Sequence, residues 1–373
     1  MTGHRLRVGI VGLQPGRSWA ARAHVPALQA LPDTFEIAGV ANSSLASAQA
    51  AVTEMGLSSK AFASVTDLAT APDIDIVTVT VKVPPHFEIV KAAIAAGKHV
   101  YCEWPLGNGL AEAEAMAELA REKGILGVVG TQSRLAPEII HLRKLIAEGY
   151  VGEVLSTTLV AYAGASLGAG TISDKRTYSY LLDRANGATA LTIPVGHTLA
   201  ALLDVLGEIA EVSAVLATRR PVAFAVDTQE WLPVSAPDQI LVSGILASGA
   251  PISIHYRGGP ARDGDGLFWE IHGTEGDIRI AGASGHTQMV QLTLKGARGD
   301  DKVFRPLEVA ASDHAGWPKE VEPGNVARLY ARMADDLRNG TRTAPSFDDA
   351  VAVHRVIAAI ENAAESGNRV VLN

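Results

Sequence analysis

RVGIVGL, residues 7–13, is the stretch that decides the fold of the N-terminal part of this chain. It is a short and almost wholly apolar run that leads into a loop containing glycine and proline. A strand that is apolar on both faces must be buried on both faces, as in a parallel sheet. A helical pattern follows over residues 19–30, so the stretch predicts the first strand–loop–helix unit of a doubly wound sheet.

Strand and helix signals keep alternating as far as residue 131, and the pattern then changes. Before that point, strands are expected at residues 35–41, 74–81, 99–102 and 126–130, and helices at 45–55, 86–96 and 110–123. After it, a helix is expected at 137–148, longer β-rich segments at 154–162, 209–218, 238–246, 252–256, 268–272 and 277–280, and helices at 325–338 and 348–366. We predict a Rossmann domain at residues 1–131 and an α/β domain on a mostly antiparallel open sheet at residues 132–373.

The composition is that of a globular protein with an acidic balance. The chain has 373 residues and a net charge of 32 − 40 = −8, which argues against a nucleic-acid or anionic membrane partner. Its single cysteine, Cys102, excludes a disulfide framework and a cysteine-based zinc site. We expect no signal peptide before the first strand, and no apolar stretch as long as the roughly 20 residues of a membrane span. We expect a soluble cytoplasmic protein.

The loop after the first strand is the first candidate site. Gly12 and Gly16 would let backbone N–H groups approach a pyrophosphate, with Gln14 and Arg17 beside them. Gln14 stands where the G-x-G-x-x-G pattern has its second glycine, so the match is partial. A tight turn with no ligand remains the alternative.

The end of the second strand bears on the choice of dinucleotide. Asn42, Ser43 and Ser44 stand where an acidic residue would hold the ribose 2′-hydroxyl of NAD. No acid is present to repel a 2′-phosphate, two hydroxyls can donate to one, and Arg17 adds positive charge. We therefore predict NADP or NAD as cofactor, with NADP bound at least as well. The alternative is a turn that caps the next helix.

Four motifs carry a resemblance to a known family. They are GIVGL near the N-terminus, AGKHVYCEWP at 96–105, QSRLAP at 132–137 and IHGTEG at 271–276. Over nearly its whole length the chain resembles the Gfo/Idh/MocA family of NAD(P)-dependent sugar and cyclitol oxidoreductases. The resemblance implies a C-terminal domain that binds a sugar-like polyol and an open sheet that forms homodimers or homotetramers.

The chain departs from the usual family pattern at two catalytic positions. Trp104 replaces the lysine between Glu103 and Pro105, and Ile193 replaces the aspartate four residues before His197. One branch of the family, which includes the fungal galactose-regulon repressor, is similar in these departures and at Trp19 and residues 175–187. In that repressor the matching tryptophan lies beside the nicotinamide, which implies a cofactor contact for Trp19.

His197 is the first candidate for proton transfer, because an ordinary imidazole pKa of about 6.5 suits that role. The alternative is a buried packing residue. Tyr180 is the second candidate, if a cation such as Lys175 lowers its pKa; the alternative is a solvated loop aromatic. Lys175, Tyr180 and His197 are together expected to contact the substrate.

Further cofactor contacts are expected after the third and fourth strands. The resemblance places Val83, His86, Glu103 and Trp104 near the dinucleotide, although His86 can equally be a plain helix residue. Glu103 is expected to hold the cofactor or its loop rather than act as a base. No second motif joins the E-x-x-H pair at residues 138–141, so we predict no metal.

The leading hypothesis is an NAD(P)-dependent oxidoreductase that transfers a hydride to or from a sugar, cyclitol or related polyol derivative. The alternative is a catalytically silent regulatory protein that senses a dinucleotide or a sugar, which the missing lysine and aspartate favour. A lyase or hydrolase that uses bound NAD transiently is a minor third hypothesis.

Overall fold

The computed structural model describes residues 5–372, which form two compact units. The first unit contains the described residues up to Gln132 together with His314–Val351. The second contains Ser133–Asp313 and the described residues from Ala352 onward. The segment His314–Val351, expected in the C-terminal domain, packs within the first unit.

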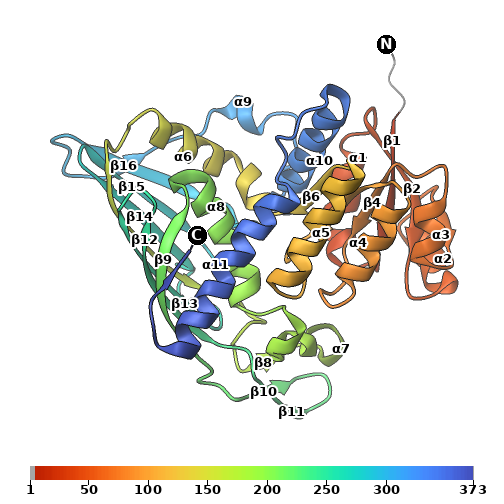
Figure 1. Cartoon of the computed structure of the whole chain (residues 1–373), viewed down its shortest axis with the longest axis horizontal. Coiled ribbons are helices and arrows are strands. Elements are labelled where there is room, and N and C mark those ends of the chain that lie inside the picture. Colours follow the sequence, from red (N-terminus) through yellow and green to blue (C-terminus); the bar gives the residue numbers. More distant parts are fainter. Residues whose placement is uncertain (1–4, 373) are drawn as a thin grey trace. The chain divides into compact units, whose positions relative to one another are not determined.

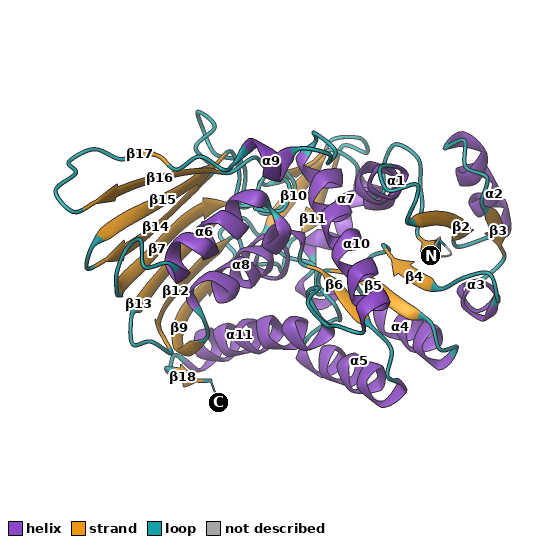
Figure 2. Ribbon diagram, turned by 90° about the horizontal axis from the view of Figure 1, so that it is seen from above, coloured by secondary structure: helices purple, strands orange, loops and turns teal. Residues whose placement is uncertain are grey.

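The first unit is built on a six-stranded parallel sheet, as predicted. Its strand order is β3-β2-β1-β4-β5-β6, so the direction of winding reverses between β1 and β4. In Figure 2, α4 and α5 lie on one face of this sheet, and α1 and α10 lie on the other. The strands are β1 Leu6–Val11, β2 Phe35–Ala41, β3 Lys60–Phe62, β4 Ile76–Val79, β5 His99–Glu103 and β6 Gly127–Gly130.

Burial explains why these strands are apolar on both faces. Every residue of β4 and β6 is buried, and so are the last four residues of β1. The first helix opens with a wide π-helical turn, Ala20–His24, and continues as α1 Val25–Gln29. The other helices of the unit are α2 Leu45–Glu54, α3 Val65–Thr70, α4 His86–Ala95, α5 Leu110–Lys123 and α10 Val321–Asn339, while α11 Phe347–Ser366 begins here and continues in the second unit.

The second unit is built on a nine-stranded sheet that is mostly antiparallel, as predicted. Its order is β17-β16-β15-β14-β7-β13-β12-β9-β18, and β7 and β13 form its one parallel pair among the described strands. Helices α6 Pro137–Ala147 and α8 Gly196–Leu206 lie on one face (Figures 1 and 2). The strands are β7 Val154–Tyr162, β9 Ile209–Ala217, β12 Gln239–Leu246, β13 Pro251–Arg257, β14 Leu267–Gly273, β15 Gly276–Gly282, β16 Thr293–Arg298, β17 Arg305–Pro306 and β18 Val370–Val371.

A small second sheet in this unit was not predicted. Its order is β11-β10-β8, with bounds Glu230–Pro233, Val222–Ala225 and Thr171–Ile172. Strands of two to four residues carry too little alternation to stand out in a sequence. The short helical turns α7 Lys175–Tyr178 and Ser179–Leu182 lie in the segment between β8 and β10.

One expectation about apolar segments needs correction. Among the described residues, the helical stretch Arg184–Leu206 is long and apolar enough to cross a membrane by length and composition. However, 72% of its apolar window is buried inside the structure, as in the core helix of a globular domain. Thr, Gly and His residues interrupt this stretch, so it contains no long unbroken apolar run although its mean hydropathy is high.

Candidate functional site

The loop after β1 has the backbone that a close phosphate approach needs. Gly12 has φ +103°, and a Cβ atom there would lie 2.7 Å from Cγ1 of Val81. Gly16 has φ +69° and open space around the position of its absent Cβ. The side chain of Gln14 is exposed, and its backbone N–H donates to the Ser18 hydroxyl at 2.9 Å. Gln14 therefore leaves the loop open instead of filling it.

The end of β2 is engaged in local contacts. The amide nitrogen of Asn42 donates to the carbonyl oxygen of Leu13 at 2.8 Å, which ties β2 to the glycine loop. Ser44 accepts from the backbone N–H of Ser47 and caps α2. Two of the three residues expected to hold a 2′-phosphate thus stabilise the fold, as in the alternative interpretation, and Ser43 is exposed.

Glu103, at the end of β5, lies in a buried polar network. One carboxylate oxygen accepts from Nε2 of His24 at 2.8 Å, and both accept from the Gln132 amide at 2.7 and 2.8 Å. Nδ1 of His24 lies 2.9 Å from the hydroxyl of Tyr330, which is 3.0 Å from that of Thr78. These bonds make Glu103 a residue that organises the edge of the sheet, which supports the expectation that it holds its loop.

His86 joins the loops that follow β4 and β5. Its Nε2 lies 3.0 Å from the carbonyl oxygen of Val81, and its Nδ1 lies 3.0 Å from that of Pro105. Burial lowers the pKa of His86, so a neutral imidazole is favoured. Val83 and Trp104, also expected near the cofactor, are 4% and 5% exposed on the same two loops.

Among the described residues of the first unit, four buried side-chain polar atoms have no hydrogen-bond partner. They lie after β1, at the end of β2 and after β6, which is the carboxyl edge of the parallel sheet. They are Nε1 of Trp19, Oδ1 of Asn42, Oγ1 of Thr131 and Oε1 of Gln132. Buried polar groups are almost always paired, and open α/β sheets bind ligands at this edge, so the cluster is the candidate ligand site of the first unit.

Thr131 and Gln132 were not among the site residues predicted from the sequence. Gln132 was part of a quoted family motif, but its contact with Glu103 joins residues 29 positions apart. The signal that could have found both residues is their position directly after β6, because side chains at the carboxyl ends of parallel strands meet at one edge.

In the second unit, His197 lies on α8 and is 3% exposed. Its Nδ1 is buried without a partner. Burial, together with the nearby His286, lowers the pKa of His197 to about 3. The ordinary pKa assumed from the sequence is therefore wrong for this structure, and the imidazole is neutral near pH 7.

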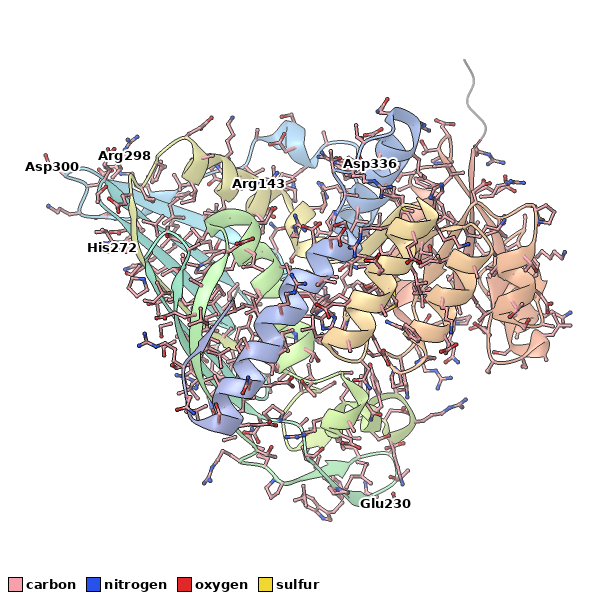
Figure 3. All side chains as sticks on the ribbon, viewed as in Figure 1. Arg143, Glu230, His272, Arg298, Asp300 and Asp336 are labelled. Atoms are coloured by element: carbon pink, nitrogen blue, oxygen red, sulfur yellow. The ribbon has the colours of Figure 1, made fainter. Side chains whose placement is uncertain are left out.

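The expected pairing of Tyr180 with Lys175 is also wrong. Burial raises the pKa of Tyr180 to about 12, the opposite of what a proton donor near neutral pH needs. The Lys175 amino group instead forms an ion pair with Glu230, labelled in Figure 3 at the hairpin of β10 and β11. The sequence could not show this ion pair, because its residues are 55 positions apart.

Among the described residues, no group of three or more histidine, cysteine, aspartate or glutamate side chains is placed to hold a metal ion. The donor set at the carboxyl edge is instead one indole N–H, one hydroxyl and two amide oxygens. These groups suit the hydroxyl and amide groups of an organic ligand, and a dinucleotide carries both.

Comparison with known proteins agrees with this geometry. Residues 6–131 match the model of the oxidoreductase family with an NAD-binding Rossmann fold, and residues 137–282 match the C-terminal domain of Gal80p. The dehydrogenase aclE of Aspergillus oryzae is 32% identical over 97% of this chain and 97% of its own length.

Two further relatives differ in what their names describe. The galactose/lactose metabolism regulatory protein GAL80 of Kluyveromyces lactis is 31% identical over 78% of this chain and 66% of its own length. The levoglucosan dehydrogenase of Pseudarthrobacter phenanthrenivorans is 26% identical over 96% of both chains. The chain belongs to the Gfo/Idh/MocA oxidoreductase family and combines its NAD-binding Rossmann domain with a Gal80-like C-terminal domain.

Proposed function

We propose that the chain binds NAD(H) at the carboxyl edge of its six-stranded sheet and acts as an oxidoreductase on a sugar-like or polyol substrate. The observation that carries the proposal is the cluster of four unpartnered buried polar atoms at that edge, next to the open glycine loop. The relatives named as dehydrogenases, one of them for levoglucosan, support the reaction type and the substrate class.

The geometry at Asn42 favours NAD over NADP. Because its amide nitrogen donates to Leu13 and Ser47, its oxygen is the atom left for a ligand. An amide oxygen accepts a hydrogen bond from a ribose hydroxyl and is repelled by a phosphate, which only accepts. The preference is the reverse of the one inferred from the sequence, which rested on the absence of an acid, the hydroxyls of Ser43 and Ser44, and the charge of Arg17.

Calorimetric titration with both dinucleotides tests this preference. We expect NAD to bind at least tenfold more tightly than NADP, a difference of about 1.4 kcal/mol. Ser43→Arg should narrow the difference, because it adds a cation at an exposed position beside Asn42. Tighter binding of NADP by the wild-type chain would contradict the assignment.

Bound NAD supplies the chemistry of hydride transfer at its nicotinamide ring. The glycine loop is proposed to hold the pyrophosphate, and Asn42 the adenosine ribose. We propose His197 as the proton-transfer group, since tryptophan at position 104 and isoleucine at position 193 exchange no proton. A neutral imidazole can accept a proton from a reacting hydroxyl, but burial, which lowers the pKa of His197 to about 3, makes it a weaker base than an ordinary histidine.

A dinucleotide-sensing regulator is the second candidate function. Trp104 and Ile193 occupy the positions of the usual catalytic lysine and aspartate, and the Gal80-like domain supports the same alternative. Incubation with NAD or NADH and a panel of sugars, cyclitols and their ketones, followed at 340 nm, separates the two. Turnover of any member supports the enzyme; tight dinucleotide binding with no turnover supports the regulator.

We further propose that the chain is a homo-oligomer through the face of the nine-stranded sheet that α6 and α8 do not cover. A row of side chains crosses this face, because Val215 pairs with Leu241, Leu241 with His255, His255 with Val160, and Val160 with Phe268. Three of these are exposed apolar side chains, at 59%, 40% and 41% for Val215, Leu241 and Phe268. Exposed apolar patches of this kind mark interfaces, and identical chains most often pair with twofold symmetry.

Light scattering after gel filtration tests the interface. Leu241→Arg should shift the wild-type dimer or tetramer towards a smaller species, because an arginine would be desolvated at the centre of the row. Gln49→Arg, at an exposed position of α2, is the matched control and should leave the mass unchanged. A monomeric wild-type chain would contradict the proposal.

A further inference from the structure

We infer that Gln132 recognises the carboxamide group of the nicotinamide ring by accepting a hydrogen bond from its NH₂ group. The inference rests on the proposed binding of NAD(H). It assigns to Gln132 the recognition of the nicotinamide carboxamide, which distinguishes NAD from analogues that lack its NH₂ group. It starts from the side-chain orientation that the buried network imposes on Gln132.

The contacts with Glu103 fix which end of the Gln132 amide is free. A carboxylate offers only acceptors, so the NH₂ group of Gln132 must face it, at 2.7 and 2.8 Å from the two oxygens. The amide oxygen of Gln132 is therefore the unpaired end of the side chain. It is buried and has no partner, on a residue that is 1% exposed.

Glu103 is itself held in place, so the orientation of Gln132 is stable. Nε2 of His24 donates to the carboxylate, and the Tyr330 hydroxyl contacts the other ring nitrogen of His24. Gly130 leaves room for the carboxylate, since a Cβ atom at that position would lie 2.7 Å from both of its oxygens. With the NH₂ group of Gln132 fixed by this network, its amide oxygen stays available to accept a hydrogen bond.

The position in the sheet indicates which part of a dinucleotide that donor belongs to. Winding reverses between β1 and β4, and a dinucleotide spans such a reversal with one mononucleotide over each half. Asn42 lies at the end of β2, in the half expected to take the adenosine. Gln132 follows β6, in the other half, which is left for the nicotinamide.

The chemistry of the ring matches the groups presented there. The carboxamide carries an NH₂ donor and a carbonyl acceptor. Gln132 presents an unpaired acceptor, and Oγ1 of its neighbour Thr131 is also buried and unpaired, so it can donate to the carboxamide oxygen. One acceptor and one donor on adjacent residues thus complement the two ends of a primary amide.

The probe that tests this is 3-acetylpyridine adenine dinucleotide, in which a methyl group replaces the carboxamide NH₂ and the carbonyl oxygen is kept. Dissociation constants for NAD and for this analogue would be measured calorimetrically on the full chain. We expect the wild type to bind NAD about tenfold more tightly, since one buried hydrogen bond is missing for the analogue. Gln132→Met, similar in size but without the acceptor, should bind NAD and the analogue equally.

Two further variants separate recognition from general damage. Thr131→Val should weaken the binding of both compounds by the same factor, because both keep the oxygen to which Thr131 donates. Glu103→Gln should reduce the preference for NAD over the analogue. A glutamine at position 103 offers both a donor and an acceptor, so it no longer forces the NH₂ group of Gln132 to face residue 103. Gln49→Met on α2 is the control and should keep the tenfold preference.

The outcomes are distinguishable. A wild type that binds NAD and the analogue equally overturns the role of Gln132 and leaves the cofactor proposal standing, as does a Gln132→Met protein that keeps the tenfold preference. A wild type that binds neither compound overturns the cofactor proposal and this inference with it. If Gln132→Met does not fold, the comparison between Glu103→Gln and wild type decides.

Discussion

Two buried polar regions of the first unit differ in how far their hydrogen bonds are satisfied. In the loop after α10, Asp336 accepts from the side chains of Thr341 and Thr343 and from the backbone N–H groups of Thr343 and Ala344, at 2.6–2.9 Å. At the carboxyl edge of the sheet, four buried polar atoms have no partner. The hydrogen bonds of the first region are completed within the protein, whereas the second region leaves four groups open to the ligand proposed above. Figure 3 labels Asp336.

The largest expected effect concerns an unpartnered atom of the second unit. Replacing His197, whose Nδ1 is buried without a partner, by alanine should lower kcat by about 10²- to 10⁴-fold, as expected for loss of a general acid–base. NAD affinity should stay within about twofold of wild type in calorimetry. A fall in kcat of less than about fivefold would remove His197 from the reaction, and the control Tyr180→Phe, whose pKa is too high for the role, should have little effect.

The pH profile sharpens the same prediction. Because burial lowers the pKa of His197 to about 3, the side chain stays neutral from pH 5 to 8. The rate should therefore not fall tenfold per pH unit below 6.5, as it would for a base of ordinary pKa. A limb with an apparent pKa near 6.5 that disappears in His197→Ala would contradict this account.

Removing the hydrogen bonds around Asp336 should destabilise the fold and leave the affinity for NAD unchanged. Asp336→Ala leaves several buried donors without an acceptor, and we expect a loss of about 3 kcal/mol in the free energy of unfolding. Urea denaturation measures this. Thermodynamic stability unchanged within about 0.5 kcal/mol would show that the loop after α10 does not depend on the carboxylate.

The same carboxylate predicts a pH dependence. Burial acts to raise the pKa of Asp336, but the hydrogen bonds to its carboxylate outweigh burial and hold the pKa in the folded chain below the ordinary value of about 3.9. Its contribution is therefore fully present above that value and is lost as the pH falls through the lowered pKa. Asp336→Asn should lose less stability at pH 7 than Asp336→Ala. Because asparagine does not titrate, this variant should also lack the acid dependence that Asp336 contributes.

A negative charge placed in the glycine loop should lower the affinity for NAD and leave stability unchanged, the reverse of what is expected for Asp336→Ala. Gln14→Glu puts a carboxylate on an exposed residue of the glycine loop, where it would repel a pyrophosphate. We expect NAD affinity to fall about tenfold, or about 1.4 kcal/mol, with unchanged stability. Gln49→Glu is the control of equal charge. This test is cleaner than a substitution of Gly12, where positive φ and the contact with Val81 would also damage the fold.

Local sequence patterns predicted the architecture well. The apolar run at residues 7–13 became β1 with buried faces, and the change after residue 131 marked the start of a mostly antiparallel sheet. What the sequence could not show depends on contacts distant along the chain. Tyr330 reaches His24 from α10 over 306 positions, so the membership of α10 in the first unit had no local signal.

The candidate site followed the same rule. Gly12 has a φ of +103°, a local property that favours glycine, so a glycine-dependent turn there could be predicted from the sequence, while its contact with a pyrophosphate stays a prediction. The pKa of His197 depends on burial, so it was misjudged from residue type alone. The orientation of the Asn42 amide depends on the carbonyl of Leu13, which residue type does not show. Side-chain partners, more than residue identities, decided which candidates remained.

The measurement that tests the central claim most directly is calorimetric titration of the full chain with NAD, with Gln14→Glu as the paired variant. The account predicts one site per chain with a dissociation constant below about 1 mM, and weaker binding by the variant. It also predicts that NAD at 100 times that constant raises the free energy of unfolding by about 2.7 kcal/mol. No heat of binding and no stabilisation up to that concentration, in a chain shown to be folded, would contradict the assignment of the carboxyl edge as a dinucleotide site.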